Sequence, residues 1–136
     1  MGNCDPGLKK TSDLTVAKEH LANALGSGDV PVLGTPAILA LAESACVAAI
    51  CDDLPEGKTS VGSYAEIEHL LPTPVGHEVQ AEATLIGHHG RRLEFNVVVR
   101  QGDDIVAKIR HRRVLVDRDR FLEKVGATPN GSKAAS

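Results

Sequence analysis

Aromatic side chains are scarce in this 136-residue sequence. It has no tryptophan, and its aromatic residues are Tyr64, Phe95 and Phe121. Hydrophobic residues still make up 42% of the chain, enough for one core of single-domain size. We therefore expect one domain whose core is aliphatic.

The cysteine patterns of disulfide-stapled and zinc-binding proteins are also missing. The chain has three cysteines, an odd number, and no CxxC spacing. Cys46 and Cys51 fall on one predicted helix and are interpreted as small buried hydrophobic residues.

Several enzyme motifs are absent as well. The chain contains no HExxH, no GxSxG nucleophile elbow and no GxxxxGK phosphate loop. Any catalysis is therefore expected to need no metal. A net charge of -3, with acids and bases mixed, gives no reason to expect nucleic acid or a membrane as partner. The N-terminus has no apolar stretch of the secretory type, so we expect a cytoplasmic protein.

Both ends of the chain are rich in Gly, Ser, Asn and Pro. We predict a flexible N-terminus at residues 1–10, one domain at residues 11–125 and a disordered tail at residues 126–136. Within the domain, residues 11–22 suggest a first strand, followed by a short helical stretch around residues 19–25.

A long buried helix is predicted over residues 37–51. The preceding Gly34-Thr35-Pro36 places Thr35 as the N-cap and Pro36 at the first helical position, and a Pro/Gly segment follows. Every residue between these marks is apolar or small except Glu43 and Ser44, so we expect burial nearly all round. The stretch is shorter than the roughly 20 apolar residues that a membrane span requires.

Four strands are predicted after the helix, at residues 59–71, 77–87, 91–101 and 104–116. Turns rich in Pro and Gly separate them, and apolar residues alternate along the last two, which indicates one buried face. The order indicates an α+β fold in which a curved antiparallel sheet wraps around one long helix.

Glu43 is the unusual residue of that helix. A buried carboxylate without a partner costs several kcal/mol, so Glu43 must be paired or must have a raised pKa. Both conditions are common where a carboxylate acts as a base or nucleophile. The alternative is a structural ion pair, or a side chain that reaches solvent.

Thr35 and His69 are the other candidate catalytic residues. Thr35 stands where free backbone N–H groups and the helix dipole favour a developing negative charge, although it can also be a simple N-cap. Thr35 and Glu43 are about 12 Å apart along a helix, so they would flank a substrate without touching. His69, at the end of the second long strand, can move protons or can be structural.

Arginines cluster on the last two strands and their turns: Arg91, Arg92, Arg110, Arg112 and Arg113. They are suited to holding phosphates of coenzyme A through charge-assisted hydrogen bonds. The alternative is a solvated face of the sheet.

Together these segments resemble a known family. The motifs are Leu33-Gly34-Thr35-Pro36, Leu41 to Cys46, Ser60-Val61-Gly62, Glu68-His69-Leu70, Thr73 to Gly76, Gly90 to Leu93 and His111 to Val114. In this order they resemble the fluoroacetyl-CoA thioesterase-like family of the hot-dog-fold thioesterase superfamily, over residues 30–121.

The resemblance implies an acyl-CoA thioesterase, active as a homodimer with its site at the interface; a tetramer is the alternative. Thr35, Glu43 and His69 would be catalytic, with Glu43 attacking the acyl carbonyl or activating water. Gly34 and Gly62 would line the thioester site, and Arg91, Arg92 and Arg113 would bind substrate. No cofactor is implied beyond the coenzyme A of the substrate.

Two other functions remain open on the same fold. One is a non-catalytic module that binds acyl-CoA or another small ligand, and the other is a hot-dog hydratase. The fluoroacetyl-selective member of the family has an aromatic lid, whereas this chain has no aromatic residue before Tyr64. We therefore expect a different small acyl group.

Overall fold

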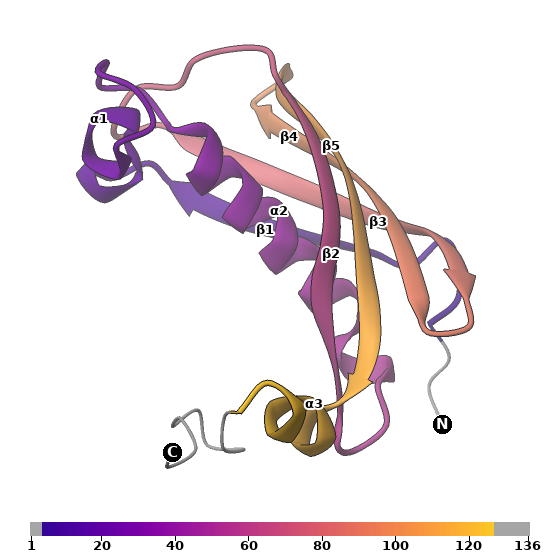
Figure 1. Cartoon of the computed structure of the whole chain (residues 1–136). Helices are drawn as coiled ribbons and strands as arrows, with labels where there is room; N and C mark the ends of the chain where they lie inside the picture. Colours follow the sequence, from indigo (N-terminus) through magenta and orange to yellow (C-terminus); the bar gives the residue numbers. More distant parts are fainter. Residues whose placement is uncertain (1–3, 127–136) are drawn as a thin grey trace.

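The computed structural model describes residues 4–126 (Figure 1). In chain order, its elements are β1 (Lys9–Thr15), the 3-10 helix η1 (Lys18–His20), α1 (Ala22–Leu25), α2 (Thr35–Ile50), the 3-10 helix η2 (Cys51–Asp53), β2 (Lys58–His69), β3 (Glu78–His89), β4 (Arg92–Gln101), β5 (Asp104–Asp117) and α3 (Arg118–Lys124).

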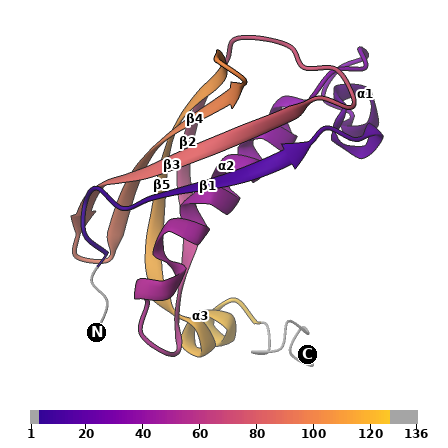
Figure 2. The ribbon, with the colours of Figure 1, turned by 180° about the vertical axis from the view of Figure 1, so that it is seen from behind.

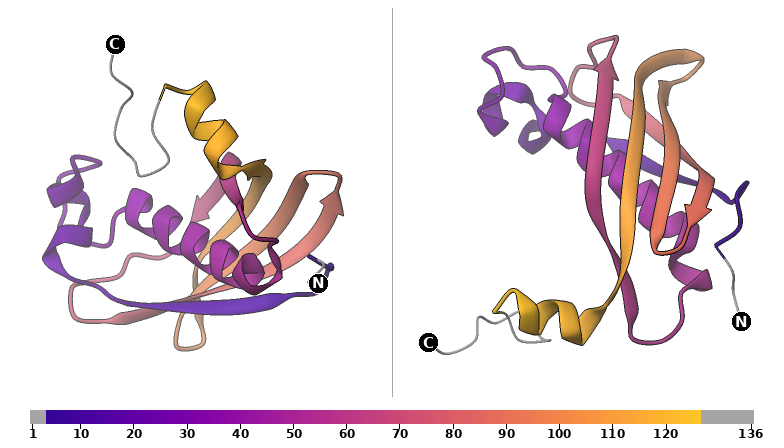
Figure 3. Two further views of the ribbon diagram at one scale, coloured as in Figure 1. Left: turned by 90° about the horizontal axis from the view of Figure 1, so that it is seen from below. Right: turned by 45° about the vertical axis from the view of Figure 1, so that its right-hand side comes forward.

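The strands form one five-stranded antiparallel sheet in the order β1-β3-β4-β5-β2. Viewed from behind, β1 and β3 lie side by side across α2 (Figure 2). Viewed from below, the sheet curves around that helix (Figure 3). The predicted arrangement of an antiparallel sheet wrapped around one long helix is therefore confirmed.

The core lies between α2 and the concave face of the sheet. Apolar side chains alternate along β3 and β4, so those facing the helix are fully buried. They are Val79, Ala81, Ala83, Leu85, Leu93, Phe95, Val97 and Val99. Phe95 is the one aromatic residue among the core side chains of the described region, so the core is aliphatic as expected.

Helix α2 is buried on one face only, which corrects the expectation of burial all round. Ile38, Ala42 and Cys46 pack against the sheet, while Ala40, Ser44 and Val47 remain exposed at helical spacing. We call these last three residues the outer face of α2. The segment Thr35–Asp53 is apolar and long enough to span a membrane by composition alone. Its packing against the sheet identifies it as a core helix instead.

The two ends of the described region differ from the prediction. The expected flexible N-terminus is wrong for residues 4–10, because Cys4 is buried, Gly7 N–H donates to the Leu85 carbonyl and β1 begins at Lys9. Residues 1–3 and 127–136 lie outside the described part. The sequence also gave no sign of α3, which projects from the end of β5 (Figure 3).

Replacing Phe95 with alanine tests the core. The ring is 1% exposed, so Phe95→Ala is expected to lower the free energy of unfolding by about 3–5 kcal/mol. Urea unfolding would measure it, with Tyr64→Ala as control because Tyr64 is 40% exposed. An equal loss in both variants would contradict this description of the core.

Candidate active site

The first polar cluster lies at the start of α2. The helix N-cap is Gly34 rather than Thr35, which is the first helical residue. The Thr35 hydroxyl is therefore not used as a cap, and its Oγ1 lies 2.8 Å from Nδ1 of His69, the last residue of β2. The His69 Nε2 is enclosed and has no protein hydrogen-bond partner within residues 4–126. The pair joins two residues that the sequence singled out separately.

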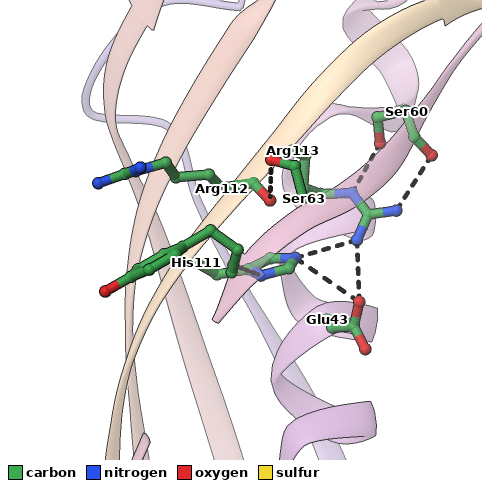
Figure 4. A network of polar contacts seen from close by, with 7 residues as sticks. Glu43, Ser60, Ser63, His111, Arg112 and Arg113 are labelled. Carbon is green, nitrogen blue, oxygen red and sulfur yellow. Dashed lines mark hydrogen bonds and ion pairs between the residues drawn. The ribbon is translucent and has the colours of Figure 1, made fainter. Parts of the chain in front are cut away.

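The second cluster surrounds Glu43, two turns further along α2 (Figure 4). Its Oε2 accepts a hydrogen bond from Arg113 Nη1 at 3.3 Å. The side chain of Arg113 is 8% exposed and that of Glu43 is 39% exposed. Glu43 is thus paired, as one of the two predicted conditions required, and it is only half-buried. Its carboxylate is anchored by one oxygen and still accessible.

Ser60 accepts two further hydrogen bonds from the Arg113 guanidinium. Arg113 Nε donates to the Ser60 hydroxyl at 2.8 Å, and Nη2 donates to the Ser60 carbonyl at 3.0 Å. Three donors of the planar guanidinium are therefore directed by fixed partners on α2 and β2. This geometry holds the positive charge next to the Glu43 carboxylate.

His111 also borders the carboxylate, with Nε2 3.7 Å from Glu43 Oε2. Its Nδ1 lies 2.8 Å from the Tyr64 carbonyl, which can only accept, so Nδ1 carries the hydrogen. Nε2 is then the acceptor for Arg113 Nη1 at 3.1 Å. Burial, partly opposed by the Tyr64 hydrogen bond, lowers the pKa of His111, and the Arg113 charge lowers it further. His111 is therefore neutral near pH 7, and Arg113 is the cation of the network.

Gly62 allows the close approach of β2 to this network. A Cβ atom at position 62 would lie 2.9 Å from Glu43 Oε2 and 3.2 Å from His111 Cε1. Any larger residue would displace the carboxylate. The predicted site glycine thus contacts the second cluster, while Gly34 lies beside the first as the N-cap of α2.

The two clusters are separate within one chain. The structure brings Thr35 to His69 and Glu43 to Arg113, and in the described part of the chain no hydrogen bond joins the pairs. The predicted catalytic residues therefore form two half-sites at different levels of the same helix, about 12 Å apart by helical rise.

The three arginines predicted to bind substrate lie in different places. Arg113 is buried against Glu43, so its expected role as a phosphate ligand is not supported by its position. Arg92 pairs weakly with Glu94 on the convex face of the sheet, away from Glu43, because it alternates with buried Leu93. Arg91 is exposed in the turn before β4 and faces an open cleft.

Cys46 is not a candidate nucleophile. Burial raises the pKa of its thiol to about 12, so it is protonated at neutral pH. Cys51, which was expected to be buried as well, is exposed after the end of α2. Within the described residues, no three His, Cys, Asp or Glu side chains are grouped to hold a metal ion.

Sequence reasoning missed His111 and Ser60, and it assigned Arg113 to the wrong kind of contact. The available signal was the alternation along β5, which places His111 and Arg113 on the same face as buried Ile109. An arginine on a buried face needs an acidic partner, and Glu43 was the unpaired acid of the core helix.

Solved structures share the fold of this chain. The fluoroacetyl-CoA thioesterase FlK superposes with a TM-score of 0.83 at 29% identity, over 89% of this chain and 94% of that chain. A thioesterase superfamily member from Thermus thermophilus superposes with a TM-score of 0.85 at 24% identity, over 92% of this chain and 93% of that one. The fold is therefore the hot-dog fold of the thioesterase superfamily.

Sequence comparison identifies the family within this superfamily. The family described as fluoroacetyl-CoA-specific thioesterase matches residues 16–119. A fluoroacetyl-CoA thioesterase from Streptantibioticus cattleyicolor is 34% identical over 101 residues, which is 74% of this chain and 73% of that protein. The chain belongs to this family, as its motifs predicted.

The Arg113–His111 contact can be tested by titration. The Arg113 charge lowers the pKa of His111, so Arg113→Gln is expected to raise it. An NMR titration of the His111 ring would measure the change. Arg112→Gln is the control, because Arg112 lies over the Tyr64 ring instead. An unchanged or lower His111 pKa in Arg113→Gln would contradict the assignment.

Proposed function

We propose that this protein is an acyl-CoA thioesterase, which hydrolyses a small acyl thioester to a carboxylate and free coenzyme A. The observation that carries the proposal is an accessible carboxylate, Glu43 of α2, which is anchored by buried Arg113. The same helix begins at Thr35, whose hydroxyl contacts His69 of β2. Membership of the fluoroacetyl-CoA-specific thioesterase family supports it.

Glu43 either attacks the acyl carbonyl, which expels the thiolate and forms an acyl anhydride that water then hydrolyses to free Glu43, or removes a proton from the water that attacks the thioester. In both cases the Glu43 carboxylate is the reacting group, and its hydrogen bond from Arg113 holds it in position. His69 gives a proton to the departing thiolate, with the Thr35 hydroxyl setting the orientation of its ring. One water is consumed, and the thioester C–S bond is broken.

A homodimer would bring the half-sites together. β2 is an edge strand of 12 residues, and its free edge offers unpaired N–H and C=O groups to a strand of another chain. The outer face of α2 is exposed, small and mostly apolar, as at a helix contact between subunits. Antiparallel pairing of two β2 strands would set Thr35 and His69 of one protomer near Glu43 of the other.

The acyl group is proposed to be short and not specifically fluorinated. The segment before α2 contains η1 and α1, and its exposed large hydrophobic side chains are Leu25 and Val30, with no aromatic residue before Tyr64. Aliphatic side chains provide an apolar wall without the precise edge and face geometry of a ring. We propose a cytoplasmic location, where acyl-CoA is available.

Removing the Glu43 charge is the direct test. Glu43→Gln keeps the shape and removes the base, so kcat/KM for acetyl-CoA or a related short acyl-CoA should fall on the order of 10²–10⁴-fold. Release of free thiol measures it. Glu82→Gln, the same change on the β3 surface, should keep full activity. Undiminished turnover in Glu43→Gln would rule out this mechanism.

The shared site can be tested by mixing two inactive variants, Glu43→Gln and His69→Ala. If each site takes Glu43 from one protomer and His69 from the other, a mixed dimer contains one intact site. Random re-association should then restore roughly a quarter of wild-type activity. No recovery, in a mixture shown to exchange subunits, would place each site within a single chain.

A further inference from the structure

A cleft with four basic residues lies between the end of the sheet and α3. It has a volume of about 200 Å³. Its cationic lining residues are Lys58, Arg91, Arg120 and Lys124, and Leu115 and Phe121 provide its apolar surface. We call it the basic cleft.

The charge of the basic cleft is not balanced locally. The chain has 15 Lys and Arg against 18 Asp and Glu, yet four of the cations meet here. The acidic lining residue is Asp117, whose side chain accepts a hydrogen bond from the Arg120 backbone as the cap of α3. None of the four cations forms a salt bridge within residues 4–126. Clustered like charges of this kind attract an anion.

The elements that border the cleft hold its cations together. Arg120 and Lys124 are four residues apart on α3 and so lie on one side of that helix. Lys58 is paired in register with Asp117 at the end of β5. Arg91 is tied to the same strand, because its carbonyl accepts from Leu115 N–H at 2.8 Å.

One lining residue of the basic cleft, Lys58, belongs to β2, the strand that also carries Gly62 beside Glu43. Lys58, Ser60 and Gly62 alternate onto one face of the strand, and a Cβ at Gly62 points at Glu43. Four residues of strand span about 13 Å. An extended pantetheine arm covers this distance between a thioester at Glu43 and phosphates in the cleft.

We propose that the basic cleft binds the phosphate groups of the nucleotide end of coenzyme A. This inference rests on the proposed thioesterase function. The cleft is smaller than the roughly 300–1,000 Å³ of pockets that enclose a whole ligand, which suits the charged end of a long substrate. Phe121 offers an apolar surface to the adenine. A carrier-protein thioester lacks the adenine nucleotide, so the cleft selects coenzyme A as the thiol.

The test removes two charges from the cleft. The double variant Arg120→Gln/Lys124→Gln is compared with wild type and with Lys9→Gln/Lys10→Gln, which loses the same charge from exposed positions on β1. Each protein is assayed with an acyl-CoA and with the matching acyl-N-acetylcysteamine, which lacks the nucleotide. Binding of adenosine 3′,5′-bisphosphate is measured separately by calorimetry.

In the cleft variant, the ratio of kcat/KM for the acyl-CoA to that for the truncated thioester should fall at least tenfold, through KM. Bisphosphate binding should weaken by a similar factor, while the control variant matches wild type. Equal ratios and equal bisphosphate affinities in all three proteins would overturn the proposal. If wild type hydrolyses neither thioester, the thioesterase function fails, and bisphosphate binding alone still decides whether the cleft takes the nucleotide.

Discussion

The ion pair between Arg113 and Glu43 is the interaction on which the rest of the site depends. A guanidinium that is 8% exposed loses most of its hydration, and this loss must be offset by partners in fixed positions. Glu43 and Ser60 supply them, from α2 and from β2. The space around this pair has no room for a side chain at position 62, which explains the glycine there. Burial and the Arg113 charge also disfavour a second cation, which explains the neutral form of His111.

The two residues of this pair meet two requirements that conflict when one carboxylate must meet both. A carboxylate is kept ionised most easily in water, whereas a reactive one is used in a site that excludes water. Here Arg113 is the buried member and Glu43 remains half exposed. The charge that anchors Glu43 thus comes from the interior, while the carboxylate itself stays accessible.

Much of the fold could be predicted from local patterns. Pro36 and the later Pro/Gly segment marked the ends of α2, and alternation marked β4, because these signals depend on near neighbours in the chain. The pairing of Arg113 with Glu43 depends instead on how α2 packs across β2 and β5, which no local pattern records. The exposed outer face of α2 was misread as buried for a related reason. Sequence pattern reports that a face is apolar, but it does not report whether the same chain covers it.

The candidate catalytic residues were found one by one from the sequence, but their grouping in space was not. Thr35, Glu43 and His69 stood out by residue type and by resemblance, yet the pairing of Thr35 with His69 needed the end of β2 to return to the start of α2. His111 was overlooked because a histidine among arginines on a strand resembles a solvated surface.

The register of β2 shifts between Gly62 and Tyr64. The sequence numbers of Gly62 and His69 differ by an odd number, so in a regular strand their side chains would point to opposite faces of the sheet. Because of the shift, Gly62 pairs with Arg113 and His69 with Ala107, and both belong to the face that covers α2. One extra residue in this strand therefore decides to which face of the sheet the side chains after it point. Loss or gain of a single residue there would leave most of the sheet intact and would turn either the glycine or the histidine away from the helix.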